Sequence, residues 1–148
     1  MSDAQKQGGF VRIEYNEEEI KRIIDNNEIV IALDDNNVIA YYLVGKKSES
    51  KSLLYQYNKA VDIAKQNNIP IEKIGYGCQV CIDENYRNNR LFSQMLGSIT
   101  TIINEKYSHL LCSISNENSS SYKSHINNNW HIVDSIEKTQ FLIYTIDK

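Results

Sequence analysis

Two arginines flank the start of a predicted helix in the segment YRNNRLF at residues 86–92. The apolar run QVCI before this segment predicts a strand, and the apolar spacing from Leu91 onward predicts the helix. The first N–H groups of a helix have no partner within it and carry partial positive charge, so anions bind there. The segment therefore fits a phosphate or pyrophosphate. An ordinary helix start with two solvated arginines has the same pattern.

A second polar segment, ISNENSSSYKSHINNNWHIV at residues 114–133, has side chains that could serve either as helix caps or as ligands. Asparagine and serine at 116–121 are typical of a helix N-terminus. The plainest interpretation is a capped short helix that leads into a strand, with Trp130 buried in the core. By itself this segment indicates no function.

The cysteines and histidines do not predict a metal site. Cys78 and Cys81 have C-x-x-C spacing, but positions three apart on a strand point to opposite faces, so the sulfurs diverge. Cys112 is the one remaining cysteine, and a zinc site of this type needs a second pair. No zinc-protease, nucleotide-loop or hydrolase motif occurs in the sequence. We expect no metal.

Length and composition predict one globular domain over residues 1–148. The chain is 41% hydrophobic and 24% charged, which is close to the average for soluble proteins. Its net charge of −3 provides no basic surplus to neutralise phosphates, so nucleic acid is not the expected partner. No apolar run approaches the length of a membrane span, and the start of the chain is polar. With an odd number of cysteines, the expected location is the cytoplasm.

Apolar periodicity predicts the elements that must position these segments. In order, we expect a helix at 17–26, strands at 28–33 and 38–44, a helix at 51–67, a strand at 73–82, a helix at 91–107, a strand at 109–114, a helix at 119–127, and strands at 130–136 and 140–146. Gly75 and Gly77 interrupt the strand at 73–82, which indicates a bulge or a close backbone approach.

Together and in this order, the two polar segments resemble the motifs of the GNAT superfamily of acetyl-CoA-dependent N-acetyltransferases. The pyrophosphate loop of that family, roughly Q/R-x-x-G-x-G/A after a strand, is similar to residues 86–92. Its later motif is similar to a set of residues at matching spacing: Asn118, Ser121, His125, Asn129 and Trp130. The resemblance covers residues 9–146. It implies an α/β (α+β) fold whose mixed, mostly antiparallel central sheet is flanked by helices on both faces.

The chain departs from the family pattern at its glycines and at its N-terminus. Asn88, Arg90 and Asn129 replace family glycines. Asparagine tolerates left-handed backbone well, whereas Arg90 could either crowd the pyrophosphate or add a charged contact to it. The family's first strand and first helix have no evident counterpart before residue 17. This predicts a trimmed chain or an exposed sheet edge, where a partner strand or a second copy in a homodimer could pair.

The resemblance implies that the chain transfers an acetyl group directly from acetyl-CoA to a small-molecule or peptide amine. Backbone groups of three strand residues would align the pantetheine: Val80, Cys81 and Ile82. Five residues at the helix start would hold the pyrophosphate: Arg87, Asn88, Asn89, Arg90 and Leu91. Asn118 would orient the cofactor near its reacting end.

The proton for the departing thiolate has two candidate donors. His125 occupies the position where many relatives place a tyrosine, and Tyr122 lies one helical turn away. His125 fits equally well a structural histidine with its hydrogen bonds satisfied. Tyr76 and Gln79 would line the acceptor pocket if their side chains face it.

Two other functions stay open at the level of sequence. A degenerate domain could hold acyl-CoA or a protein partner without turnover, an alternative that Arg90 and the missing first strand motivate. A structural domain could instead pair through an exposed sheet edge. Saturable cofactor binding without release of CoA would favour the first alternative, and dimerisation without cofactor affinity would favour the second.

Overall fold

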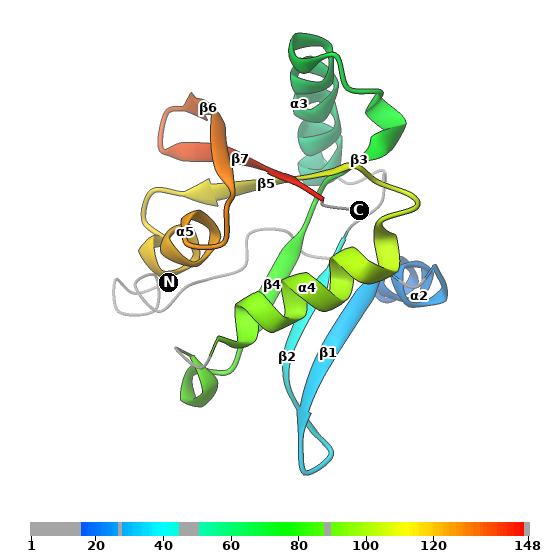
Figure 1. The fold of residues 1–148 in the computed structure, drawn as a ribbon, viewed down its shortest axis with the longest axis vertical. Coiled ribbons are helices and arrows are strands. Elements are labelled where there is room, and N and C mark those ends of the chain that lie inside the picture. Colours follow the sequence, from blue (N-terminus) through cyan, green and yellow to red (C-terminus); the bar gives the residue numbers. More distant parts are fainter. Residues whose placement is uncertain (1–15, 27, 45–50, 88–89, 147–148) are drawn as a thin grey trace.

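The computed structural model describes residues 16–26, 28–44, 51–87 and 90–146 (Figure 1). The helices and strands within these ranges are α2 (Glu17–Asp25), β1 (Ile29–Asp34), β2 (Asn37–Leu43), α3 (Lys51–Asn67), β3 (Ile74–Gly75), β4 (Gln79–Ile82), α4 (Leu91–Ile103), β5 (His109–Ser115), α5 (Ser119–Ile126), β6 (His131–Ile136) and β7 (Thr139–Thr145). Short 3₁₀ turns, η1 (Ile71–Lys73) and η2 (Glu84–Tyr86), precede β3 and follow β4. Each predicted element is confirmed, with one strand divided in two.

The strands form two sheets, which are mostly antiparallel. One has the order β1-β2-β4 and the other the order β3-β5-β7-β6. Only β3 and β5 pair in parallel among the described strands. A mixed, mostly antiparallel arrangement is therefore confirmed, but the strand predicted at 73–82 is not continuous. It divides at Tyr76–Cys78, where Gly77 adopts φ 70°, a left-handed conformation that glycine adopts without strain.

Because of this division, β4 and β5 diverge. β5 pairs with β3 only at His109 and Leu110, and the rest of β5 continues past the end of β3. β4 instead pairs with β2, from Gln79 opposite Leu43 to Ile82 opposite Ala40. Figure 1 shows β4 running away from β5 beyond β3. The two strands thus share an origin and separate toward their carboxyl ends.

Helices cover both faces of the sheets, as predicted. On one face, Phe92, Met95 and Ile99 of α4 pack in a buried cluster with Leu110 and Leu142. On the other face, α3 packs in a second cluster, formed by Ala60, Ile63, Ala64, Ile74, Tyr76, Leu111, Phe141 and Ile143. Consecutive strand residues point to opposite faces, so the two clusters lie on opposite sides of β5 and β7. The first cluster also contains residues of β2, so α4 bridges the two sheets.

The start of α2 shows how local sequence fixes these elements. The Glu19 backbone N–H donates to Asn16 Oδ1 at 2.8 Å, and the Asn16 N–H donates to Glu19 Oε1 at 3.1 Å. This reciprocal pair is a capping box, and it satisfies two N–H groups at the start of the helix. It sets the helix so that Ile23 is buried.

Gly75 lies at the last paired position before the strands separate. A Cβ atom there would lie 2.8 Å from Leu110 Cδ2 and 3.0 Å from Val44 Cγ1, so it is side chains, and not the predicted backbone, that approach Gly75 closely. We expect Gly75→Ala to lower the free energy of unfolding by about 1–3 kcal/mol, because the added methyl overpacks this contact. Urea denaturation measures the change.

Gly97 in α4 provides the matched control for this substitution. A Cβ atom at Gly97 meets nothing within 4 Å. Gly97→Ala should therefore raise the free energy of unfolding by about 0.5–1 kcal/mol through helix propensity alone. A Gly75→Ala protein as stable as the wild type would show that the Leu110 and Val44 side chains move aside without a cost in free energy.

Two predictions about the chain's edges and membranes have different outcomes. Residues 1–15, where the family's first strand would lie, are outside the described residues, so its absence stays a prediction. Among the described strands, β1 and β6 each pair with one neighbour, and the homodimer also stays a prediction. None of the described helices has both the length and the apolar character to cross a membrane.

Candidate functional site

The divergence of β4 from β5 gives β4 an edge that no described strand occupies. β2 pairs along one side of Gln79–Ile82, and the other side is directed away from β2. Val80 and Ile82 pack toward the α4 cluster, while Cys81 is exposed. The Asp83 N–H donates to the Ile39 carbonyl oxygen, so the alternate residue Cys81 also turns its backbone groups toward β2, contrary to the role predicted for it. The backbone groups of Val80 and Ile82 face the open side and can hydrogen-bond to an extended ligand laid beside the strand. This is the position that the sequence predicted for the pantetheine.

The loop after β4 leads directly to the start of α4. Arg87 Nε donates to the Ile82 carbonyl oxygen at 3.2 Å, which ties the loop to the end of the strand. Arg90 occupies the N-cap position of α4 and makes no side-chain cap hydrogen bond. Among the described residues, the N-cap side chain thus leaves the first N–H groups of α4 uncapped. These groups lie beside an exposed arginine, an arrangement that favours an anion. Asn88 and Asn89 lie outside the described residues.

Two of the residues that replace family glycines have backbone conformations that favour glycine. Arg90 has φ 61° and Asn129 has φ 69°. For a residue with a Cβ atom, this left-handed region costs roughly 1–2 kcal/mol, and asparagine tolerates it best. The resemblance to glycine-containing motifs is therefore reproduced in the backbone. At Arg90 the chain retains a strained residue at the very point where an anion would bind.

Asn118 begins α5 and lies next to the predicted proton donors. Its side chain is 6% exposed, and Oδ1 accepts from the Ser121 N–H at 3.3 Å. This confirms the predicted helix cap. A role of Asn118 toward a cofactor stays a prediction.

His125 is held in the core between two aromatic rings. Its ring centroid lies 4.7 Å from that of Phe92 and 4.8 Å from that of Trp130, and the residue is 3% exposed. Nδ1 lies 2.7 Å from the Ser121 carbonyl oxygen, which can only accept, so Nδ1 carries the proton. Burial lowers the pKa of His125 to about 4. The ring is therefore neutral near pH 7, which favours the structural interpretation of this histidine.

Tyr122 is the more accessible of the two candidate donors. It lies on the same helix one turn before His125, and its side chain is half-buried against the α4 cluster. Its backbone N–H donates to the Asn118 carbonyl oxygen at 3.1 Å. A phenol that reaches solvent can donate a hydrogen bond or a proton to a thiolate. The geometry therefore favours Tyr122 over His125.

Tyr76 and Gln79, the two residues predicted for the acceptor pocket, share the face opposite α4. Tyr76 belongs to the α3 cluster, its ring lies 5.6 Å from that of Tyr57, and burial raises its pKa to about 12. Gln79 points away from α4, and its Oε1 accepts from the Tyr41 hydroxyl at 3.0 Å. No sequence motif singled out Tyr41. The alternation around buried Tyr42 could have placed it on this face.

The cysteines do not form a shared site. Cys78 packs against the α4 cluster, and Cys81 is exposed beside Tyr41 on the strand pair. Burial raises the pKa of Cys78 to about 12, so its thiol stays protonated at neutral pH. Within the described part of the chain, no three His, Cys, Asp or Glu side chains gather in a way that could hold a metal ion.

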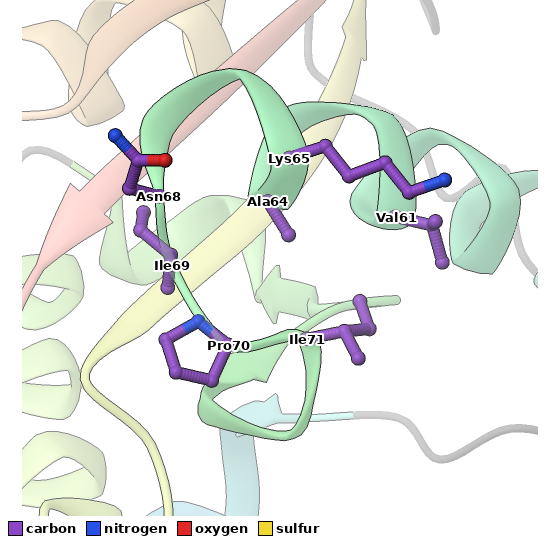
Figure 2. Close-up of a pocket in the computed structure, with 7 residues that line it drawn as sticks. All are labelled: Val61, Ala64, Lys65, Asn68, Ile69, Pro70 and Ile71. Carbon is purple, nitrogen blue, oxygen red and sulfur yellow. The ribbon is translucent and has the colours of Figure 1, made fainter.

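A surface pocket of about 390 Å³ lies elsewhere, between the last turns of α3 and η1 (Figure 2). Figure 2 shows Ala64 and Ile71 among its lining residues and Lys65 at its side. None of the predicted site residues lines this pocket. It is therefore separate from the region between β4 and β5.

Comparison with known proteins identifies the fold. No family model and no curated protein matches the sequence. The GNAT domain of S. lividans PAT is similar in structure, with TM-score 0.65 and 12% identity over 97% of this chain and 78% of that chain. A GNAT-family acetyltransferase from Streptococcus pneumoniae has TM-score 0.60 and 14% identity over 91% and 79%. A GNAT-superfamily phosphinothricin acetyltransferase from Sinorhizobium meliloti, solved with acetyl-CoA, has TM-score 0.59 and 12% identity over 86% and 65%. This chain therefore has the GNAT fold.

Proposed function

We propose that this chain is an N-acetyltransferase that moves an acetyl group from acetyl-CoA to a primary amine by direct transfer. The observation that carries the proposal is the divergence of β4 from β5 beside the uncapped start of α4. It offers a strand edge for an extended arm and a helix N-terminus for a pyrophosphate at the end of the same strand. The acetyl-CoA complex of the Sinorhizobium enzyme with this fold supports the same ligand.

The proposed reaction brings together three groups where the strands separate: the attacking amine, a donor to the oxyanion and an acid for the leaving thiolate. The amine nitrogen attacks the thioester carbonyl carbon, a C–N bond forms and the C–S bond breaks. A backbone N–H on the open edge of Val80–Ile82 would stabilise the oxyanion. Tyr122 would donate its proton to the leaving thiolate, and the amine would lose a proton to solvent. A lysine-like amine, with reference pKa about 10.4, must be deprotonated before it attacks.

The remaining predicted residues would bind the cofactor. Asn118 would orient its reacting end. The pyrophosphate would be held at the loop and helix start by Arg87, Asn88, Asn89, Arg90 and Leu91. Guanidinium groups and backbone N–H groups are the usual ligands of such anions.

Calorimetric titration of the full chain with acetyl-CoA tests the proposal. We expect a dissociation constant in the micromolar range and weaker binding of dephospho-CoA, which lacks one phosphate. Release of free thiol in the presence of amines then follows turnover. If acetyl-CoA shows no heat of binding up to millimolar concentration, the proposed function is wrong.

A module that binds acyl-CoA without turnover is the second candidate, and strained Arg90 is the observation that favours it. We expect Arg90→Gly to raise the free energy of unfolding by about 1 kcal/mol, because glycine adopts φ 61° without strain. The same change should weaken acetyl-CoA binding about threefold to tenfold, since one charged contact is lost. Urea denaturation and calorimetry measure the two effects.

Asn129→Gly is the matched control. Asn129 also has positive φ, but it follows the C-terminal end of α5 and not the start of α4, where the pyrophosphate would bind. It should leave acetyl-CoA binding unchanged and raise stability less, since asparagine is less strained there. Tighter binding by Arg90→Gly would show that the arginine obstructs the pyrophosphate and would strengthen the second candidate.

A further inference from the structure

Gln56 of α3 places a buried amide against β5 on the face opposite α4 and α5. The residue is 5% exposed, and its Nε2 donates to Ser113 Oγ at 2.6 Å. Its Oε1 is buried and has no hydrogen-bond partner within the described residues. Rotating the amide by 180° would exchange the two atoms and leave the nitrogen unpaired instead. In either orientation, one polar atom of Gln56 lacks a partner, which costs stability.

The Gln56–Ser113 pair lies where β4 and β5 have separated. Leu110 is the last β5 residue that pairs with β3, and Ser113 lies about 10 Å further along the strand. β4 does not follow β5 to the level of Ser113, because it pairs with β2 instead. The side of Ser113 away from β7 is therefore not occupied by a described strand. The unpaired amide atom thus lies beside the proposed path of the thioester.

Gln56 and the candidate proton donor Tyr122 lie on opposite faces of the sheets. Tyr76, whose ring packs on that of Tyr57 in α3, lies on the same face of the sheets. The candidate proton donor Tyr122 packs with the cluster on the opposite face. An amine that attacks a thioester between the strands would approach from the α3 face, with the acid for the thiolate behind it. A carbonyl oxygen at this point would accept an N–H of that amine.

We infer that Gln56 binds the amino group of the acetyl acceptor, with the amine N–H donating to Oε1 while Ser113 holds the other end of the amide. The inference rests on the proposed function. Tyr57, the next residue of α3, packs on Tyr76 on the same face of the sheets. We therefore expect the acceptor to be a primary amine on a short apolar arm. Because the amine donates an N–H in this hydrogen bond to Oε1, its nitrogen lone pair stays available to attack the thioester carbon.

Replacing Gln56 with methionine tests this inference, because methionine keeps the length and removes the polar atoms. With n-butylamine and phenethylamine as probes, we expect the KM for the amine to rise about tenfold, the effect of one lost hydrogen bond. The KM for acetyl-CoA should stay within twofold, and the thermal midpoint should not fall. Gln66→Met, at an exposed position of the same helix, is the control and should change neither KM.

The outcomes separate this inference from the proposed function. If Gln56→Met keeps the wild-type KM for both amines, the inference is wrong and the proposed function stands. A wild-type chain that binds acetyl-CoA but acetylates neither probe also overturns the inference. Absence of acetyl-CoA binding overturns the proposed function itself. If Gln56→Met does not fold, Gln56→Glu takes its place, because it retains an accepting oxygen. Gln56→Glu should keep the KM for the amine at or below that of the wild type. A tenfold rise in that KM would refute the role of Gln56 in binding the amine.

Discussion

Replacing Tyr122 by phenylalanine is expected to lower kcat about 100-fold, the lower range of what a positioned general acid contributes. The dissociation constant for acetyl-CoA should stay within twofold, because the ring and its packing against the α4 cluster remain. The physical reason is that the thiolate leaving from the thioester must receive a proton. Tyr122 is the half-exposed candidate on α5, whereas His125 is buried and neutral. Single-turnover kinetics with saturating acetyl-CoA measure the chemical step.

Lys123→Ala is the matched control for Tyr122→Phe, because Lys123 is the exposed neighbour on the same helix. It should leave kcat within twofold. If Tyr122→Phe retains kcat within threefold, the hydroxyl does not protonate the thiolate, and water or another donor must do so.

The sequence predicted the elements well wherever apolar spacing alone decides them. The helix expected at 51–67 is present as Lys51–Asn67, and the hairpin around residues 34–37 has the expected strands. The helix expected to reach 107 ends at Ile103. Beyond Ile103, Tyr107 contacts a residue far away in the sequence: its hydroxyl donates to Glu28 Oε1 at 3.0 Å. Helical spacing cannot reveal such a contact, because its partner lies far away in the sequence.

The division of the strand at 73–82 is the part of the fold that the sequence could only suggest. Gly75 and Gly77 indicated an irregularity, but not that its two ends would join different sheets. Which strand becomes a neighbour is decided by tertiary packing, here by α4 lying across both sheets. That choice creates the separation of β4 from β5 on which the proposed function depends.

The candidate site was predicted in outline, but Gln56, which we infer to bind the acceptor, was not among the predicted residues. The strand and the helix within residues 79–96 are confirmed, and so is the cap at Asn118. Gln56 was not found, because its partner Ser113 lies 57 residues away and no motif links the two. The burial of His125 was equally hidden, since Phe92 comes from a helix in another part of the chain. Single-sequence patterns report local structure, and these contacts are not local.

Lowering the pH from 6.5 to 4 is expected to cost the wild type about 3 kcal/mol more in free energy of unfolding than it costs His125→Phe. The pKa of His125 is lowered to about 4 in the folded chain by burial, against an ordinary value of 6.5. Between these values the unfolded chain binds a proton that the folded chain does not, so acidification favours unfolding. Above pH 6.5 both states are neutral and the difference disappears. Urea denaturation at several pH values measures it.

His131→Phe is the control, because His131 is exposed at the start of β6. It should leave the pH dependence of stability as in the wild type, and the carboxylates that titrate in this range are common to all three proteins. Parallel stability curves for the wild type and His125→Phe would mean that His125 ionises near its ordinary pKa while folded. A histidine that ionises there would be able to donate a proton, and the assignment of the acid would return to His125. The pH dependence of stability and the kcat of Tyr122→Phe therefore decide the same question by independent measurements, one of which requires no turnover.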